Sequence, residues 1–241
     1  MAALENPQVG ADPLLDEFLP LMQAYDIPAD AVLHLLEGLI SDQSEVALEN
    51  ADQLILYSYQ VAGTVGRMMC PVLGCTDQKA VRHAIDMGIG MQLTNIARDV
   101  REDAEMGRRY LPANWVDGLS AQTIASIAHQ PQTAEYQLIQ RATERLLKLA
   151  DQYYASGEQG LASLPLRARC AIAVAGRVYR EIGIQLRDKE YRWGEGRVVT
   201  TKWQKIAVSI PALAGHIHAR TPRHAHASHL HRPLLNLLPP H

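Results

Sequence analysis

The sequence predicts an all-α fold, and two observations carry the prediction. Apolar residues recur three and four positions apart, the spacing of a helix with one buried face, in the segments 14–25, 31–40, 51–69, 79–105, 121–129, 133–156 and 166–190. Proline and glycine separate these segments, and no alternating apolar pattern competes except at 197–201. With 241 residues and 47% apolar content, the chain can bury one substantial core. We therefore expect a single helical domain.

Each expected helix has boundary signals. At the first helix, Asp12 and Asp16 surround Pro13, and acidic groups at a helix start contribute about 0.3–1 kcal/mol through the helix dipole. The later boundaries are proline or glycine positions, namely 28, 71, 107, 112, 131 and 165. These short breaks indicate helices joined by tight loops.

Composition excludes several classes of function. A net charge of −3 gives no electrostatic footprint for nucleic acid. Cys70, Cys75 and Cys170 lack C-x-x-C spacing, which argues against a disulfide framework or a zinc site. Neither a signal peptide nor an apolar run of the ~20 residues needed to cross a bilayer is visible. We expect a cytoplasmic protein, whose oligomeric state the sequence does not indicate.

Residues 207–241 differ from the rest in composition. The segment 216–241 holds seven of the ten histidines and four prolines. Such tracts can bind transition metals, but a disordered terminus with incidental affinity is the commoner case. We expect a disordered tail after a helical domain at 1–206.

The most informative segment is 92–112, QLTNIARDVREDAEMGRRYLP. At about 100° per residue, Gln92, Asn95, Asp99 and Asp103 share one helix face. Carboxylates four residues apart repel, unless solvent screens them or a cation lies between them. Oxygen ligands of this kind suit Mg²⁺, which is commonly bound together with substrate phosphates. The pattern therefore predicts a magnesium site that binds a phosphate ester or diphosphate.

The alternative is a solvated acidic face, which is the commoner meaning of D-x-x-x-D alone. Apolar residues occupy nearly every side of the segment 85–96, so this helix should be buried. Buried polar groups need partners, which favours a binding face.

The segment 92–112 resembles the second aspartate-rich motif of the squalene/phytoene synthase family, the head-to-head prenyl diphosphate synthases. The run LYSYQVAGTVG at 56–66 is similar to a tyrosine-rich family helix, and 153–202 resembles the family's C-terminal helices. The resemblance covers about residues 12–206. It implies an isoprenoid-synthase-type helical bundle around a central hydrophobic cavity.

The resemblance also implies an activity, and bacterial carotenoid-biosynthesis members are the most similar. A phytoene synthase joins two geranylgeranyl diphosphates through a cyclopropylcarbinyl diphosphate. A squalene or dehydrosqualene synthase acting on farnesyl diphosphate is the alternative. No nicotinamide-binding signature is evident, so we expect no nicotinamide cofactor. An apolar product would favour peripheral association with a membrane.

The family's functional residues can be carried over by position. Asn95, Asp99 and Asp103 would hold Mg²⁺, with Mn²⁺ as a possible substitute, and Gln92 would orient the substrate. Asp99 and Asp103 would promote departure of the diphosphate, and Tyr179 matches a tyrosine near the reacting carbons.

Six basic residues are candidates for diphosphate contact. Arg98 and Arg197 match phosphate-binding positions, although the helical wheel places Arg98 beside the metal face, about 100° from Asp99. The remaining candidates are left open; they are Arg108, Arg109, Lys202 and Lys205.

The helix at 51–69 carries Ala62, Gly63 and Gly66 three and four positions apart. Such spacing allows either tight helix packing or close approach of a long flat ligand. The resemblance favours a wall of the prenyl channel, with Tyr57 and Val61 nearby.

The family's first aspartate-rich motif has no counterpart here. Asp12 and Asp16 have its spacing, but they lie at a helix start in the wrong register. The chain thus resembles a synthase without its first helices. Two further hypotheses stay open: a catalytically inactive helical protein, or a chain whose Met1 is an internal methionine of a longer one.

Overall fold

The computed structural model describes residues 13–75, 77–198, 201, 207–211 and 226–238. In this part of the chain no strand forms, and one isolated bridge joins Ala47 to Arg109. The predicted all-α class is confirmed. The helices are α2 (Pro13–Ala24), α3 (Ala29–Ser41), α4 (Ala51–Ser58), α5 (Thr64–Val72), α6 (Gln78–Arg98), α7 (Val100–Glu105), α8 (Ala121–Ile127), α9 (Ala134–Gly160) and α10 (Leu166–Asp188).

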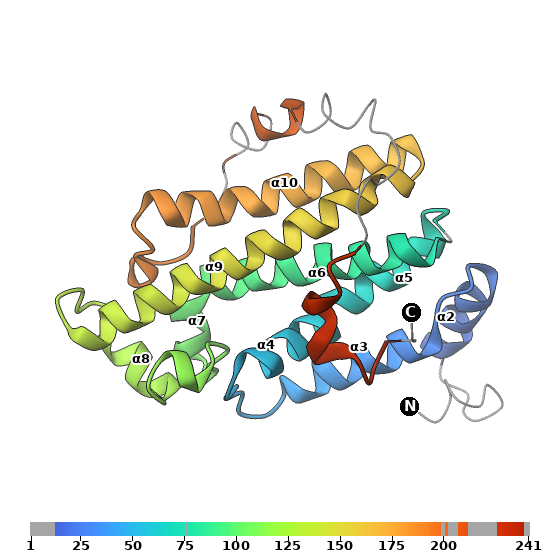
Figure 1. Cartoon of the computed structure of the whole chain (residues 1–241). Helices are drawn as coiled ribbons and strands as arrows, with labels where there is room; N and C mark the ends of the chain where they lie inside the picture. The colour runs from blue at the N-terminus through green and yellow to red at the C-terminus, as the bar shows by residue number, and fades with distance from the viewer. Residues whose placement is uncertain (1–12, 76, 199–200, 202–206, 212–225, 239–241) are drawn as a thin grey trace.

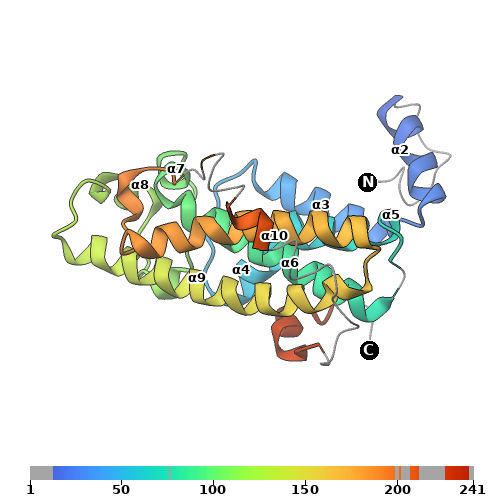
Figure 2. The same ribbon diagram turned by 90° about the horizontal axis from the view of Figure 1, so that it is seen from above.

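Helix α6 is the centre of the bundle. It packs against α9 and α10 on one side and against α4 and α5 on the other (Figure 1). Helix α2 stands apart at one end (Figure 2). Short turns complete the fold; they are the π-helical turn η1 (Tyr59–Gly63) and the 3-10 turns η2 (Ala113–Trp115), η3 (Leu161–Ser163), η4 (Trp193–Glu195) and η5 (Ser228–Leu234).

Side-chain caps begin several of these helices. Asn50 accepts a hydrogen bond from the Gln53 amide at the start of α4, and Asp77 does the same for Lys79 at the start of α6. Ser120 and Thr133 cap α8 and α9 in the same way. Each cap satisfies a backbone donor that the helix itself leaves free.

Two predicted helices are interrupted. The segment 51–69 contains the π-helical turn η1, a feature that often occurs at functional sites. The segment 79–105 divides at Asp99, whose φ of −105° and ψ of 15° leave the helical range. The Asp103 amide donates to the Asp99 carbonyl at 2.8 Å, so α7 begins directly after the break.

Glycines bring backbones into direct contact around α6. A Cβ on Gly66 would lie 2.2 Å from the Ala84 carbonyl oxygen, and one on Gly88 would lie 2.4 Å from that of Ala62. A Cβ on Gly157 of α9 would meet Met87 at 2.9 Å. Tight helix packing, one of the two explanations for these small residues, is therefore observed at Gly66.

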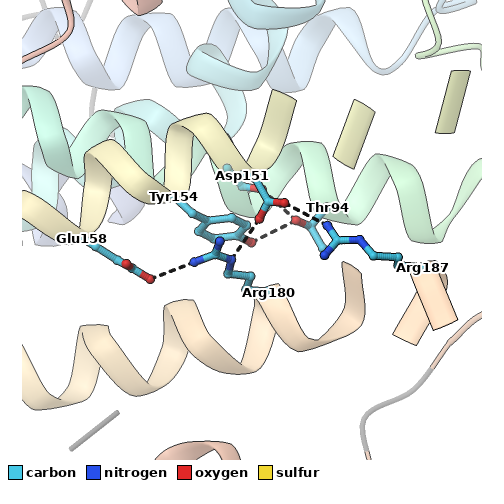
Figure 3. A network of polar contacts seen from close by, with 7 residues as sticks. Thr94, Asp151, Tyr154, Glu158, Arg180 and Arg187 are labelled. Carbon is cyan, nitrogen blue, oxygen red and sulfur yellow. Dashed lines mark hydrogen bonds and ion pairs between the residues drawn. The ribbon is translucent and has the colours of Figure 1, made fainter. Parts of the chain in front are cut away.

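Helix α10 is fastened to α9 by ion pairs (Figure 3). Arg180 Nε lies 3.0 Å from Asp151 Oδ1, and Arg187 Nη2 lies 2.9 Å from Asp151 Oδ2. The network adds contacts to α6, and its labelled members are Thr94, Asp151, Tyr154, Glu158, Arg180 and Arg187. These contacts hold α10, which also carries Tyr179, against α9.

Part of the C-terminal segment differs from the disordered tail that we expected. Leu230, His231 and Leu234 of η5 are buried, and Tyr153 donates a hydrogen bond to the Leu230 carbonyl at 2.7 Å. Residues 226–238 pack because two leucines four positions apart reach the core. Positions 212–225 and 239–241 lie outside the described residues.

We expect Gly66→Ala to lower the free energy of unfolding by about 1–3 kcal/mol, because the new methyl group overlaps a backbone carbonyl that cannot rotate away. Chemical denaturation followed by circular dichroism measures this change. Gly183→Ala is the matched control, because its Cβ would meet only the end of the Leu147 side chain at 3.1 Å. Equal losses in both variants would contradict the packing explanation.

Candidate active site

The junction of α6 and α7 brings the predicted metal ligands together. Gln92 and Asn95 lie on the last turns of α6, Asp99 lies at the break, and Asp103 lies on α7. Asn95 Nδ2 donates to Gln92 Oε1 at 3.4 Å, whereas Asn95 Oδ1 is buried with no hydrogen-bond partner. A buried carbonyl oxygen without a donor is the kind of group that a cation would satisfy.

Asp99 is paired with two arginines. Arg98 donates from Nε to Oδ1 at 2.7 Å and from Nη2 to Oδ2 at 2.5 Å. Arg197 Nε lies 3.1 Å from the same Oδ1. The helical wheel places Arg98 beside the metal face, and from that position its long side chain turns back onto its neighbour's carboxylate.

The turn η4 positions Arg197. Arg101 of α7 donates to the Gly194 carbonyl at 3.2 Å, and Trp193 stacks on Tyr136 with ring centroids 4.8 Å apart. A Cβ on Gly194 would lie 1.9 Å from the Ala128 carbonyl oxygen. The chain after α10 is thereby brought to the α6–α7 junction.

Asp103 carries the strongest electrostatic signal of the site. Burial raises the pKa of this carboxyl to about 7, with further increases from the negative charges of Asp99, Glu102 and Asp42, while Arg108 acts in the opposite direction. The positive charge of Arg108 therefore offsets only part of the burial and negative charge that disfavour ionised Asp103. Together with the partnerless Asn95 oxygen, it forms a donor set that fits Mg²⁺.

Asp42 is a residue that sequence reasoning missed. It accepts hydrogen bonds from Tyr57 at 2.9 Å and from Tyr110 at 2.8 Å, and these two rings stack with centroids 4.8 Å apart. Burial is the main cause that raises the pKa of both phenols, that of Tyr110 to about 12. A lone aspartate at the end of a helix has no motif that could have revealed it.

Loop pairing brings Asp42 to this position. The Arg109 amide donates to the Val46 carbonyl at 2.7 Å, and the Leu48 amide donates to the Arg109 carbonyl at 3.2 Å. Arg108 Nη2 donates to the Asp42 carbonyl at 3.0 Å.

The two arginines whose roles the sequence left undecided therefore have different surroundings. Arg109 is buried and its guanidinium donates to the carbonyls of Leu48 and Leu111, which is a structural role, whereas Arg108 acts electrostatically on Asp103. Lys202 and Lys205 lie outside the described residues.

A cavity of about 340 Å³ opens beside the aspartates. Its polar end is lined by Gln92, Asn95 and Tyr179, and its remaining walls are almost wholly apolar. Val61 and Gly66 line it as predicted, whereas Tyr57 is not among its lining residues. Along α6 the lining extends from Ala80 to Asn95, about 22 Å at 1.5 Å per residue.

Comparison with known proteins identifies the family. Residues 2–204 match the model of the squalene/phytoene synthase family. The chain belongs to this family. Its relatives include the 15-cis-phytoene synthase of Pantoea ananas, 39% identical over 222 residues that cover 89% of this chain and 70% of that protein. The phytoene synthase of Pseudescherichia vulneris is 36% identical over 225 residues, which cover 92% of this chain and 71% of that protein.

Solved structures of the squalene/phytoene synthase family share the fold. A dehydrosqualene synthase in complex with a ligand superposes with a TM-score of 0.73 and 25% identity, over 89% of this chain and 74% of that one. The squalene synthase HpnC of Alicyclobacillus acidocaldarius gives a TM-score of 0.68 at 20% identity, over 79% and 74% of the two chains. The helical bundle implied by the resemblance is thus confirmed.

We expect Asp103→Asn to raise the free energy of unfolding by about 1–3 kcal/mol at pH 8 in metal-free buffer, and by much less at pH 5. The native carboxyl holds its proton up to about pH 7, whereas an unfolded one loses it near pH 3.9. The wild type therefore loses stability as pH rises through this interval, and the amide does not.

Urea denaturation at both pH values measures this difference. Glu105→Gln is the matched control on α7, because Glu105 is exposed and its ion pair among the described residues is with Arg101. A gain that is equal at pH 5 and pH 8 would show that Asp103 is not the group responsible.

Proposed function

We propose that this chain catalyses the head-to-head condensation of two geranylgeranyl diphosphates to phytoene. One observation carries the proposal: a long apolar cavity ends at polar groups beside two aspartates and two arginines. Such a cavity fits a prenyl tail, and the charged end fits its diphosphate. The 36–39% identity to phytoene synthases supports this reaction.

Asn95, Asp99 and Asp103 are the residues that would hold Mg²⁺ or Mn²⁺. A bound divalent cation neutralises charge on the diphosphate and so favours its departure. Ionised Asp103 is required for this role, and the raised pKa of its carboxyl keeps it partly protonated near pH 7 until a cation is present. The chain itself contributes the fixed oxygen donors.

Arg98 and Arg197 would change partners when substrate enters. Each guanidinium contacts the Asp99 carboxylate, and guanidinium groups also bind phosphate oxygens bidentately. Transfer of the arginines to the diphosphate would leave the Asp99 carboxylate available to a cation. One pair of arginines thereby links binding of substrate to binding of metal.

The length of the cavity matches the length of a C20 prenyl tail. At the advance of ~1.2 Å per bond of an extended chain, a geranylgeranyl tail measures about 19 Å, and the lining along α6 measures about 22 Å. Cys70, Cys75 and Ala80 form a small buried cluster at the far end. Each buried CH₂ contributes about 0.8 kcal/mol, so the apolar walls supply much of the binding free energy.

Tyr179 lies where the tail meets the charged groups. It lines the polar end of the cavity, and it is close enough to Arg98 to affect the pKa of that guanidinium. We assign it to the reacting carbons, where an aromatic face can stabilise positive charge. Asp42 accepts a hydrogen bond from the Tyr57 phenol and also acts electrostatically on Asp103, so Tyr57 would act at the charged end of the substrate.

A squalene-type reaction on farnesyl diphosphate is the second candidate. The structural similarity to a dehydrosqualene synthase favours it, and a shorter tail also fits the cavity. For either apolar product we propose peripheral docking on a membrane, because Val65, Met69 and Val72 expose an apolar face of α5 that continues into the cavity. No helix of the described residues is long and apolar enough to cross a bilayer.

We expect the purified chain, supplied with Mg²⁺ and geranylgeranyl diphosphate, to release phytoene detectable by liquid chromatography. Asp99→Asn should lower kcat at least ~100-fold, because it removes charge that acts at the departing diphosphate. Glu105→Gln, an exposed acidic neighbour, should change it little. A C30 hydrocarbon from farnesyl diphosphate as sole product would contradict the phytoene assignment, and no turnover would favour the inactive-protein hypothesis.

We expect Ala80→Leu to shorten the far end of the cavity and to lower kcat/KM for geranylgeranyl relative to farnesyl diphosphate about tenfold, as expected when about two methylenes lose their contacts. Val65→Leu is the control, because Val65 lines the cavity but is 42% exposed. Competition between the two substrates measures the ratio. An unchanged ratio in Ala80→Leu would mean that the tail ends elsewhere.

A further inference from the structure

A second polar cluster lies away from the aspartates, at the middle of α6. The Asp86 carboxylate is completely buried and is bound by two histidines of the C-terminal segment. His226 Nε2 lies 2.7 Å from Asp86 Oδ2, and His231 Nε2 lies 2.7 Å from Asp86 Oδ1. Ser156 of α9 donates to Oδ2 at 2.5 Å. The carboxylate thus joins α6, α9 and the segment containing η5.

His83 completes the cluster from α6. It is buried, its Nδ1 lies 3.1 Å from Ser156 Oγ, and its ring meets that of His226 edge-on with centroids 5.2 Å apart. One ligand atom from each of His83, Asp86 and His226 lies within 4.8 Å of the other two. Two metal-ligating groups from α6 and one from the C-terminal segment therefore converge on one point.

The chemistry of these groups matches a transition metal and not magnesium. Two imidazoles and one carboxylate are the ligands of three-residue zinc sites, in which the fourth position is left to water or another donor. Ligand bonds of about 2.0–2.2 Å place such atoms about 3.4 Å apart, so side-chain rotation within the 4.8 Å limit can close the set on an ion. Mg²⁺ prefers oxygen ligands.

The hydrogen bonds within the cluster leave two ring nitrogens without partners. Nδ1 of His226 and Nδ1 of His231 are buried without a hydrogen-bond partner, so hydrogen bonds alone leave this cluster unsatisfied.

We propose that His83, Asp86 and His226 form a Zn²⁺ site that fastens the C-terminal segment onto α6 and α9. His231 contacts the second oxygen of Asp86 and would orient the carboxylate instead of binding the ion. The site also supports the cavity wall, because His83 packs against Gly160, a lining residue whose added Cβ would lie 2.4 Å from His83 Cβ.

Zinc binding by the 241-residue chain tests this proposal. Protein equilibrated with Zn²⁺ in millimolar Mg²⁺ and then gel-filtered should retain about one Zn²⁺ per chain by elemental analysis. Co²⁺ in its place should give visible absorption of a nitrogen- and oxygen-ligated ion. Zn²⁺ should also raise the melting temperature, because it binds only the folded cluster.

His226→Gln should weaken Zn²⁺ binding at least tenfold and abolish the rise in melting temperature, and His83→Gln should do the same from the other side of the cluster. The matched control is His229→Gln, because His229 is exposed on the same turn η5. His231→Gln should have a smaller effect than His226→Gln.

Two outcomes would overturn the proposal. Equal Zn²⁺ retention by His226→Gln and the wild type would assign the ion to other tail histidines. No retained Zn²⁺ in a folded wild type would show that hydrogen bonds, without a metal ion, hold the cluster together. Both readouts are independent of prenyl diphosphate turnover, so failure of the proposed reaction would not affect them.

Discussion

The burial of helix α6 is the constraint on which the rest of the structure depends. Its apolar residues face neighbours on nearly every side, and eleven of its residues between Ala80 and Ala97 are buried. A polar group left without a partner in such a place costs about 1–3 kcal/mol. Asp86, in the middle of α6, meets partners from other elements, whereas the buried Oδ1 of Asn95 near the end of the helix has none among the described residues.

Close packing around α6 also determines the cavity. Gly66 and Gly88 let α5 and η1 approach α6 until backbones touch, and Gly157 and Gly160 do the same for α9. These four glycines also line the cavity. Part of the cavity wall is therefore formed by glycines whose close contacts the bundle already requires.

The charges at the α6–α7 junction favour function over stability. Asp42, Asp99 and Asp103 place three carboxylates near one another, and the arginines compensate them unequally. Asp99 is paired with Arg98 and Arg197, whereas the carboxyl of Asp103 keeps a raised pKa. Such uncompensated charge is a cost that proteins retain at sites where a cation or substrate restores the balance.

The sequence alone determined the features that depend on local spacing. Helical periodicity located the helices, and proline and glycine lie at or near most of the breaks. The spacing of Asn95, Asp99 and Asp103 predicted that they share one face, because residues three and four apart meet on a helix whatever surrounds it. Backbone details within these helices depend on packing, so the break at Asp99 and the π-helical turn η1 were not foreseen.

Only the tertiary structure decided which distant residues meet. Asp42 reaches Tyr110 through the pairing of two loops, and His226 reaches Asp86 across 140 positions of the chain. The sequence showed a histidine-rich tail and a lone aspartate in an apolar helix, and neither pattern names its partner. Their contact depends on Leu230 and Leu234 docking against the bundle, because long-range contacts are fixed by the packing of whole elements and leave no local periodicity to read.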